Sequence, residues 1–371
     1  MKHSMYISAL ALTAAVSIGY AQNAGQQPAP ADPAGQGRGG GRGGGQATPP
    51  GPREVPARTF PIPDTVSPEM QALVGRGIGA NWNVIPKTDE EWATAAGRGA
   101  GAPGNIGPGN PATLEQLGVK SEPATMNGVP GYMLTPNVIS PENKDRLLMH
   151  VHGGCYVMGG GGVAEGVYMA GFGHIKVFSV DYRRPPNAFY PAALDDVVNA
   201  WKGVIKTGDP KKMGMVGLSA GGALVLSAVL KLKAEGAPLP AAIAPGTPMA
   251  DLTGKGDSME TNKLIDNVLV GYGRCDAMGE FYAHGKDLKD PYLSPIYGDF
   301  KGFPPAILTT GTRDLLLSST VRVHRKLRQA GVEAVLQVFE GQAHAQYNNA
   351  TPEGKEAYEE IAKFFDKHLA K

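Results

Sequence analysis

The sequence contains little cysteine and almost no net charge. Two cysteines among 371 residues can form neither a disulfide framework nor a four-cysteine zinc site. Lysine and arginine number 35 and aspartate and glutamate 34, so the net charge is +1, which argues against a nucleic-acid-binding protein. Charged residues make up only 19% of the chain and hydrophobic residues 42%, which indicates a sizeable folded core rather than a disordered chain.

Apolar runs long enough to cross a membrane are also lacking, since a spanning helix needs roughly 20 residues. The run Ile7–Ile18 is shorter, follows the basic start Lys2-His3 and precedes the small residues of Gly19-Tyr20-Ala21. This order is typical of a secretory signal peptide that is cleaved after Ala21. We therefore expect residues 1–21 to be a signal peptide and the mature protein to be secreted or periplasmic, with no membrane span.

Residues 22–55 contain almost no large apolar side chains. The chain has 52 glycines and 31 prolines among its 371 residues, and both shares exceed the average usages of about 7% and 5%. The excess is concentrated in this segment, as in Arg38–Gly45. Such a segment cannot offset its ordering entropy by burial, so we predict a disordered Gly/Pro-rich tether. With only two arginines in its glycine-rich run, Arg38 and Arg42, and no aromatic residue, it gives little support for an RGG-type RNA-binding arm. Residues 56–371 suffice for a single domain.

Apolar strand patterns alternate with helical patterns from about residue 145 onward. We predict strands at 146–151, 175–180, 212–217, 305–310 and 335–339, and helices at 224–232, 318–330 and 353–369. This alternation predicts an α/β fold with a mostly parallel central sheet flanked by helices, in which ligands bind at the carboxyl ends of the strands. Two stretches, about 60–117 and 251–290, fit the alternation poorly, and we interpret them as a helical lid over these ends.

The segment Gly217-Leu218-Ser219-Ala220-Gly221 matches the motif G-x-S-x-G between a predicted strand and a predicted helix. In this context the serine sits on a tight turn that exposes its hydroxyl near a helix N-terminus. An ordinary glycine-rich helix start is the alternative. Upstream, His152-Gly153-Gly154-Cys155 follows a predicted strand, and adjacent glycines allow backbone N–H groups to bind the oxyanion of a tetrahedral intermediate.

A serine nucleophile needs a general base and an acid that orients the base. Asp314 follows the predicted strand 305–310, and His344 follows the strand 335–339, so both lie at strand carboxyl ends after Ser219. The other histidines are weaker candidates; for example, His324 and His368 fall within predicted helices. We therefore predict that Ser219, Asp314 and His344 form a catalytic triad.

These motifs together resemble the hormone-sensitive-lipase-like family of α/β-hydrolase esterases, over about residues 145–370. His152–Tyr156 is similar to the family's HGGG signature, and Asp181–Asp196 to its DYRLAPEHPFPAALDD segment. Gly217–Gly222 resembles GDSAGG, and the surroundings of Asp314 and His344 resemble the family's acid and histidine loops.

The resemblance implies an α/β-hydrolase fold with a lid, built around a serine nucleophile. Ser219 would be the nucleophile, Asp314 the acid and His344 the base, with the N–H groups of Gly153, Gly154 and Ala220 as the oxyanion hole. Family members cleave carboxylic esters, mostly with short to medium acyl chains, and need no metal or organic cofactor. The expected partner is thus a small-molecule ester, and the oligomeric state is not predicted.

The sequence departs from the family pattern beside two of these motifs. Cys155 replaces the third glycine of HGGG, and Leu218 replaces the aspartate before the nucleophile. Candidates for the substrate pocket are His152, Cys155, Tyr156 and Leu218. In an oxidising compartment Cys155 and Cys275 form either a disulfide or two separate thiols, and the sequence alone gives no distance between them.

We therefore predict an exported serine carboxylesterase that acts on short- to medium-chain esters through an acyl-enzyme on Ser219. Its activity should fall below about pH 6, where a protonated His344 no longer acts as a base. Two alternatives remain. One is a carbohydrate (xylan) deacetylase or lactone hydrolase that uses the same three residues, and the other is a non-catalytic binding module on a hydrolase fold.

Overall fold

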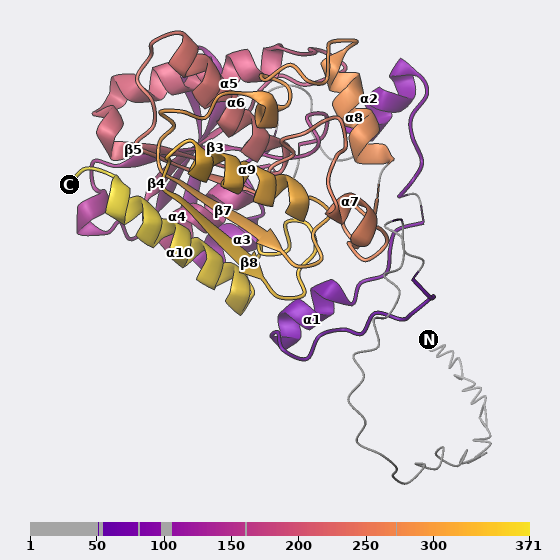
Figure 1. The fold of residues 1–371 in the computed structure, drawn as a ribbon. Coiled ribbons are helices and arrows are strands. Elements are labelled where there is room, and N and C mark those ends of the chain that lie inside the picture. Colours follow the sequence, from indigo (N-terminus) through magenta and orange to yellow (C-terminus); the bar gives the residue numbers. More distant parts are fainter. Residues whose placement is uncertain (1–50, 52–54, 81, 98–105, 160–161, 272) are drawn as a thin grey trace, which may run out of the picture. The chain divides into compact units, whose positions relative to one another are not determined.

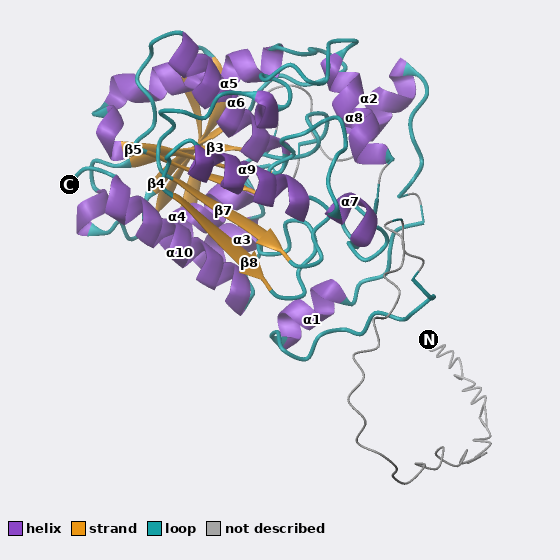
Figure 2. Cartoon of the chain, in the orientation of Figure 1, coloured by secondary structure: helices purple, strands orange, loops and turns teal. Residues whose placement is uncertain are grey.

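Eight strands form a single sheet within residues Arg58–Lys371, which make up one compact unit (Figures 1 and 2). The computed structural model describes residues 51, 55–80, 82–97, 106–159, 162–271 and 273–371. The predicted signal peptide and nearly all of the predicted tether lie outside these residues. The strands are β1 (Val119–Met126), β2 (Val129–Pro136), β3 (Leu147–Val151), β4 (Lys176–Val180), β5 (Met213–Leu218), β6 (Ala242–Gly246), β7 (Ala306–Gly311) and β8 (Ala334–Phe339).

The sheet is parallel except at one edge, in the order β1-β2-β4-β3-β5-β6-β7-β8. Strands β1 and β2 pair antiparallel with each other, and β2 pairs antiparallel with β4. All other pairs are parallel. Asn127 and Gly128 join β1 to β2 with φ values of 49° and 85°, the positive values that a tight two-residue hairpin turn requires. The predicted mostly parallel α/β fold is confirmed.

Helices cover both faces of the sheet. Successive residues of a strand point to opposite faces, so a strand that is apolar throughout presents an apolar surface on each side. On β3, Met149 and Val151 pack into one apolar core, and Leu148 packs into the other. Helices α5, α6 and α9 contribute to the first core, and α4 and α10 to the second. The helices are α1 (Pro68–Val74), α2 (Asp89–Gly97), α3 (Pro111–Leu117), α4 (Ala164–Gly173), α5 (Ala192–Val204), α6 (Ala220–Ala234), α7 (Ser258–Thr261), α8 (Arg274–Ala283), α9 (Leu317–Gln329) and α10 (Pro352–His368), with 3-10 turns at Pro141–Asn143, Ile205–Thr207, Pro210–Lys212 and Pro295–Tyr297.

The two segments outside the alternating pattern contain short helices. Helices α2 and α8, far apart in the sequence, lie side by side, and the rings of Trp92 and Phe281 stack with their centroids 4.5 Å apart (Figure 1). Helix α3 packs against α4 instead, through Leu114 and Leu117. Among the described residues, no helix has the length and apolar character of a membrane span.

Candidate active site

Ser219 occupies a sharp turn between β5 and α6, with φ 61° and ψ −120°. Such a conformation is strained for a residue other than glycine and persists only where the surroundings hold it. The N–H of Ser219 donates to the carbonyl of Gly246 (2.9 Å), and the Ser219 carbonyl accepts from the N–H of Met249 (3.0 Å). A Cβ at Gly221 would lie 1.9 Å from the carbonyl oxygen of Val151, so this turn requires glycine there.

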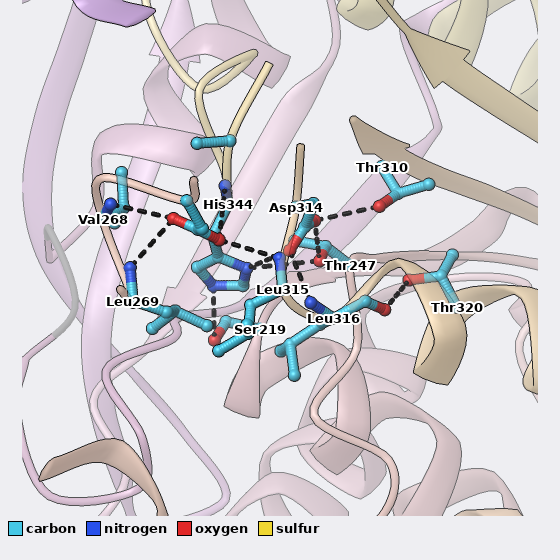
Figure 3. A network of polar contacts seen from close by, with 12 residues as sticks. Ser219, Thr247, Val268, Leu269, Thr310, Asp314, Leu315, Leu316, Thr320 and His344 are labelled. Carbon is cyan, nitrogen blue, oxygen red and sulfur yellow. Dashed lines mark hydrogen bonds and ion pairs between the residues drawn. The ribbon is translucent and has the colours of Figure 1, made fainter. Parts of the chain in front are cut away.

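The structure brings Ser219, His344 and Asp314 together at the carboxyl edge of the sheet (Figure 3). Ser219 Oγ lies 3.0 Å from His344 Nε2, and His344 Nδ1 lies 3.1 Å from Asp314 Oδ1. All three residues are buried. Since the carboxylate of Asp314 only accepts, Nδ1 carries the proton and Nε2 is free to accept the proton of the Ser219 hydroxyl.

The carboxylate of Asp314 is held by several donors besides His344. Its Oδ2 accepts hydrogen bonds from the hydroxyls of Thr247 and Thr310, and its Oδ1 accepts from the N–H of Leu316 (2.8 Å; Figure 3). Burial by itself would raise the pKa of Asp314, but the charge and hydrogen bond of His344, with the hydrogen bonds from Thr247 and Leu316, outweigh it and leave the pKa below its ordinary value. Asp314 therefore stays ionised beside the imidazole.

The pKa of His344 is shifted in the opposite direction. Burial by itself lowers it, but the charge of Asp314, its hydrogen bond and the charge of Asp266 outweigh burial and raise the pKa above its ordinary value. The imidazolium form is thus stabilised. This is the form that a general base adopts after it takes a proton.

Gly153 lies directly against the serine turn, and Gly154 follows it in the loop after β3. A Cβ at Gly153 would lie 2.8 Å from the carbonyl oxygen of Leu218 and 3.1 Å from Cβ of Ser219. Gly154 has a φ of 103°, which favours glycine. Among the described residues, no acceptor takes a backbone hydrogen bond from the N–H of Gly153, Gly154 or Ala220. These three donors are therefore available to a ligand.

His152 and Tyr182 fix the peptide between the two glycines. The Gly153 carbonyl accepts from His152 Nδ1 (2.8 Å) and from the Tyr182 hydroxyl (3.3 Å), which also donates to the His152 carbonyl (2.9 Å). The two rings stack with centroids 4.1 Å apart. Burial, with the charge of Arg184, lowers the pKa of His152 well below its ordinary value, so its ring is neutral. Because the peptide is trans, the Gly154 N–H points away from the Gly153 carbonyl.

The other predicted pocket residues are placed around this loop. Cys155 forms a disulfide with Cys275 of α8, with a Cα–Cα distance of 5.5 Å, so of the two alternatives that the sequence left open the structure has the disulfide. Tyr156 is buried and stacks on Tyr282, with centroids 4.6 Å apart. Leu218 is the last residue of β5, and its side chain packs in the apolar core beside α10.

Sequence reasoning missed three polar residues of the site, namely Thr247, Thr310 and Asp266. Thr247 follows β6, a strand whose Ala-Ile-Ala-Pro-Gly sequence gives a weak strand signal. Thr310 lies within β7, and because threonine is common in strands, nothing marks its hydroxyl as part of the site. Asp266 lies in the loop between α7 and α8, and nothing in its local sequence marks it. Within the described residues, no group of three His, Cys, Asp or Glu side chains is arranged to hold a metal ion.

Comparison with known proteins identifies the family. Residues 148–348 match the family model for the alpha/beta hydrolase fold. The crystal structure of the esterase E25 is similar with a TM-score of 0.79 and 37% sequence identity, covering 86% of this chain and 99% of that one. An esterase from the bacterial hormone-sensitive lipase family has a TM-score of 0.68 and 27% identity, covering 82% of this chain and 99% of that one.

A relative found by sequence comparison is named as an acetyl-hydrolase. An acetyl-hydrolase of Streptomyces hygroscopicus is 29% identical over 306 residues, which cover 80% of this chain and 96% of the relative. The chain therefore belongs to the α/β-hydrolase family, in its hormone-sensitive-lipase-like group of esterases.

Proposed function

We propose that the protein hydrolyses carboxylic esters through an acyl-enzyme on Ser219. The observation that carries this proposal is the 3.0 Å contact between Ser219 Oγ and His344 Nε2, with Asp314 on the opposite ring nitrogen. A serine hydroxyl is a weak nucleophile by itself and needs such a base. The acetyl-hydrolase and the esterases among its relatives support the ester as the bond that is cleaved.

In acylation, Ser219 Oγ attacks the ester carbonyl carbon while His344 Nε2 takes the hydroxyl proton. The imidazolium then donates this proton to the leaving alcohol, and the acyl group stays on Ser219. In deacylation, His344 takes a proton from water, whose oxygen attacks the acyl carbon. The imidazolium then returns this proton to Ser219 Oγ as the bond to the acyl carbon breaks and the acid is released. Asp314 keeps the ring oriented and stabilises its charge in both steps.

The N–H groups of Gly153, Gly154 and Ala220 bind the oxyanion of each tetrahedral intermediate. Ala220 opens α6, where the partial positive charge of the helix N-terminus adds to its own N–H. The Gly154 donor is supported from behind by His152 and Tyr182, which hold the preceding carbonyl. Donors that are fixed before reaction stabilise developing charge with little reorganisation.

We propose esters of short- to medium-chain acids as substrates, with acetyl esters foremost. The acetyl-hydrolase name of the relative supports a short acyl group. The tested esters would be p-nitrophenyl acetate, butyrate and octanoate. The rate should decline from the shorter esters to octanoate, and fastest turnover of octanoate would contradict the short-chain proposal.

The role of Ser219 is tested by comparing the wild type with Ser219→Ala and with Ser227→Ala. Ser227 is a buried serine two turns further along α6 and serves as the matched control. Ser219→Ala should lower kcat by about 10⁴-fold or more, whereas Ser227→Ala should stay near the wild type. Equal, slow rates of the wild type and Ser219→Ala would contradict the proposal and favour a non-catalytic binding module.

We also propose that the protein is exported and is cleaved after Ala21. The support is the order of basic, apolar and small residues in residues 1–21 together with the Cys155–Cys275 disulfide, since disulfides persist in oxidising compartments. N-terminal sequencing of the protein from the periplasm or medium should begin at Gln22. Protein that stays in the cytoplasm with residues 1–21 intact would contradict export.

A further inference from the structure

We propose that Asp266 is a positioning residue for this reaction, whose carboxylate ties the loop of Asp314 to the loop of His344. This inference rests on the proposed function and adds a residue to it. Asp266 lies between α7 and α8, in the segment inserted between β6 and β7. Among the described residues, its hydrogen bonds go to neighbours of Ser219 and not to Ser219, so it acts through the residues that it holds.

The carboxylate of Asp266 is fully buried and accepts four backbone hydrogen bonds. Oδ1 accepts from the N–H groups of Val268 (2.8 Å) and Leu269 (3.0 Å) in its own turn. Oδ2 accepts from the N–H groups of Leu315 (2.8 Å) and His344 (3.2 Å). Figure 3 shows Val268, Leu269 and Leu315 gathered around His344. The inserted segment thus supplies the acceptor for all four.

A single oxygen, Oδ2, joins the two loops that follow β7 and β8. Leu315 is the residue after Asp314, so this hydrogen bond fixes the backbone of the acid loop. The second donor is the N–H of His344 itself, so the same oxygen fixes the residue whose ring must reach Ser219. Asn262 adds a further contact from the same segment, because its Nδ2 donates to the main-chain carbonyl oxygen of Asp314 (2.8 Å).

Asp266 also places a second carboxylate near the imidazole. The groups whose charges reach His344 are Asp314 and Asp266, and the hydroxyls of Ser219 and Thr247 face its two ring nitrogens. Burial and the charge of Asp314 leave the pKa of Asp266 above its ordinary value, although the charge of His344 and the hydrogen bonds from the N–H groups of Leu315 and Val268 act in the opposite direction. An ionised Asp266 therefore favours the imidazolium that forms when Ser219 loses its proton. A residue that only stabilised the fold would have no such effect.

The test compares Asp266→Asn with Asp251→Asn in the wild-type background. Asp251 is a buried carboxylate of the same inserted segment that pairs with Arg322 (2.7 Å), and its hydrogen bonds within the described residues do not include Asp314 or His344. The pH dependence of kcat/KM is measured on p-nitrophenyl butyrate, with Ser219→Ala alongside. The pH at half-maximal rate is a useful readout because it does not depend on how much of a variant is folded.

Asp266→Asn should lower kcat by about tenfold or more, with little change in KM, and should move the acid limb of the profile to lower pH. Asp251→Asn should leave the acid limb in place. An unmoved acid limb in Asp266→Asn would overturn the inference. If Ser219→Ala also kept its activity, the proposed function itself would fail, so the two failures are distinguishable.

A measurement on the wild type covers the case in which Asp266→Asn does not fold. The side-chain carboxyl of Asp266 is followed by ¹³C NMR through a pH titration, beside the ring signals of His344. The inference predicts that the Asp266 signal shifts at the midpoint at which His344 titrates. An Asp266 signal that does not respond to His344 would overturn it.

Discussion

Cys155, the residue after Gly153 and Gly154, is joined by a disulfide to Cys275 in α8, 120 residues later in the sequence. The bond connects the loop after β3 to the inserted segment. Helix α8 in turn packs on α2, where Trp92 stacks on Phe281. One covalent bond therefore links the candidate oxyanion loop to the helices outside the alternating α/β pattern.

Removing this disulfide should destabilise the fold. A bond that closes so long a loop restricts the unfolded chain, and its loss typically costs about 2–4 kcal/mol. A reductant should therefore lower the melting temperature of the wild type by several degrees and leave a Cys155→Ala/Cys275→Ala double variant unchanged. A thiol titration that finds two free groups in denatured, unreduced protein would contradict the bond.

The acid limb of the pH–rate profile should lie above pH 6.5, the ordinary pKa of histidine. A general base is inactive when protonated, and the carboxylates of Asp314 and Asp266 raise the pKa of His344, so activity is lost at a higher pH than for an unperturbed histidine. This places the limb above the value of about pH 6 expected from the sequence. Profiles of kcat/KM from pH 5 to 9 test it, and a flat rate from pH 5 to 8 would rule it out.

A methyl group at Gly153 should disable the site without unfolding the protein. In Gly153→Ala the new Cβ would lie 2.8 Å from the Leu218 carbonyl oxygen, so the loop must shift away from Ser219. Loss of one oxyanion donor costs roughly 10²–10³ in kcat. Gly77→Ala is the control, because nothing lies within 4 Å of its Cβ. Equal kcat values for the two variants would argue against the proposed oxyanion hole.

Tyr182→Phe should have a milder effect on the same loop. The change removes the hydroxyl that donates to the carbonyls of His152 and Gly153 and keeps the ring that stacks on His152. One hydrogen bond is worth about 1 kcal/mol, so kcat should fall about fivefold with little change in KM. Tyr190→Phe, whose hydroxyl bonds Asp290, is the matched control. A Tyr182→Phe rate as high as that of the control would show that the Gly154 donor needs no such support.

The parallel half of the fold could be predicted because its strands are buried on both faces. The predicted strands at 146–151, 175–180, 212–217 and 305–310 each match an observed strand within one residue at either end. β6 was missed, since Ala-Ile-Ala-Pro-Gly has low strand propensity and only its neighbours hold it in the sheet. The hairpin β1–β2 was missed although Asn127-Gly128 is a strong hairpin signal.

The candidate site could be predicted where a residue of a type used in catalysis directly follows a strand that the sequence shows clearly. Ser219, Asp314 and His344 each follow a recognisable strand, and the structure places all three within hydrogen-bonding reach. Thr247 follows the strand that was missed. Asp266 belongs to a loop whose path depends on the packing of the whole inserted segment, so no local pattern could place it beside His344.

The covalent intermediate on Ser219 is the most direct test of the proposed chemistry. The wild type is mixed with p-nitrophenyl butyrate, quenched in acid within the first turnover and digested for peptide mass spectrometry. The account predicts a butyryl group on the peptide that contains Ser219 and none on the same peptide of Ser219→Ala. A butyryl group on another residue, or a Ser219→Ala variant that turns over the ester as fast as the wild type, would contradict it.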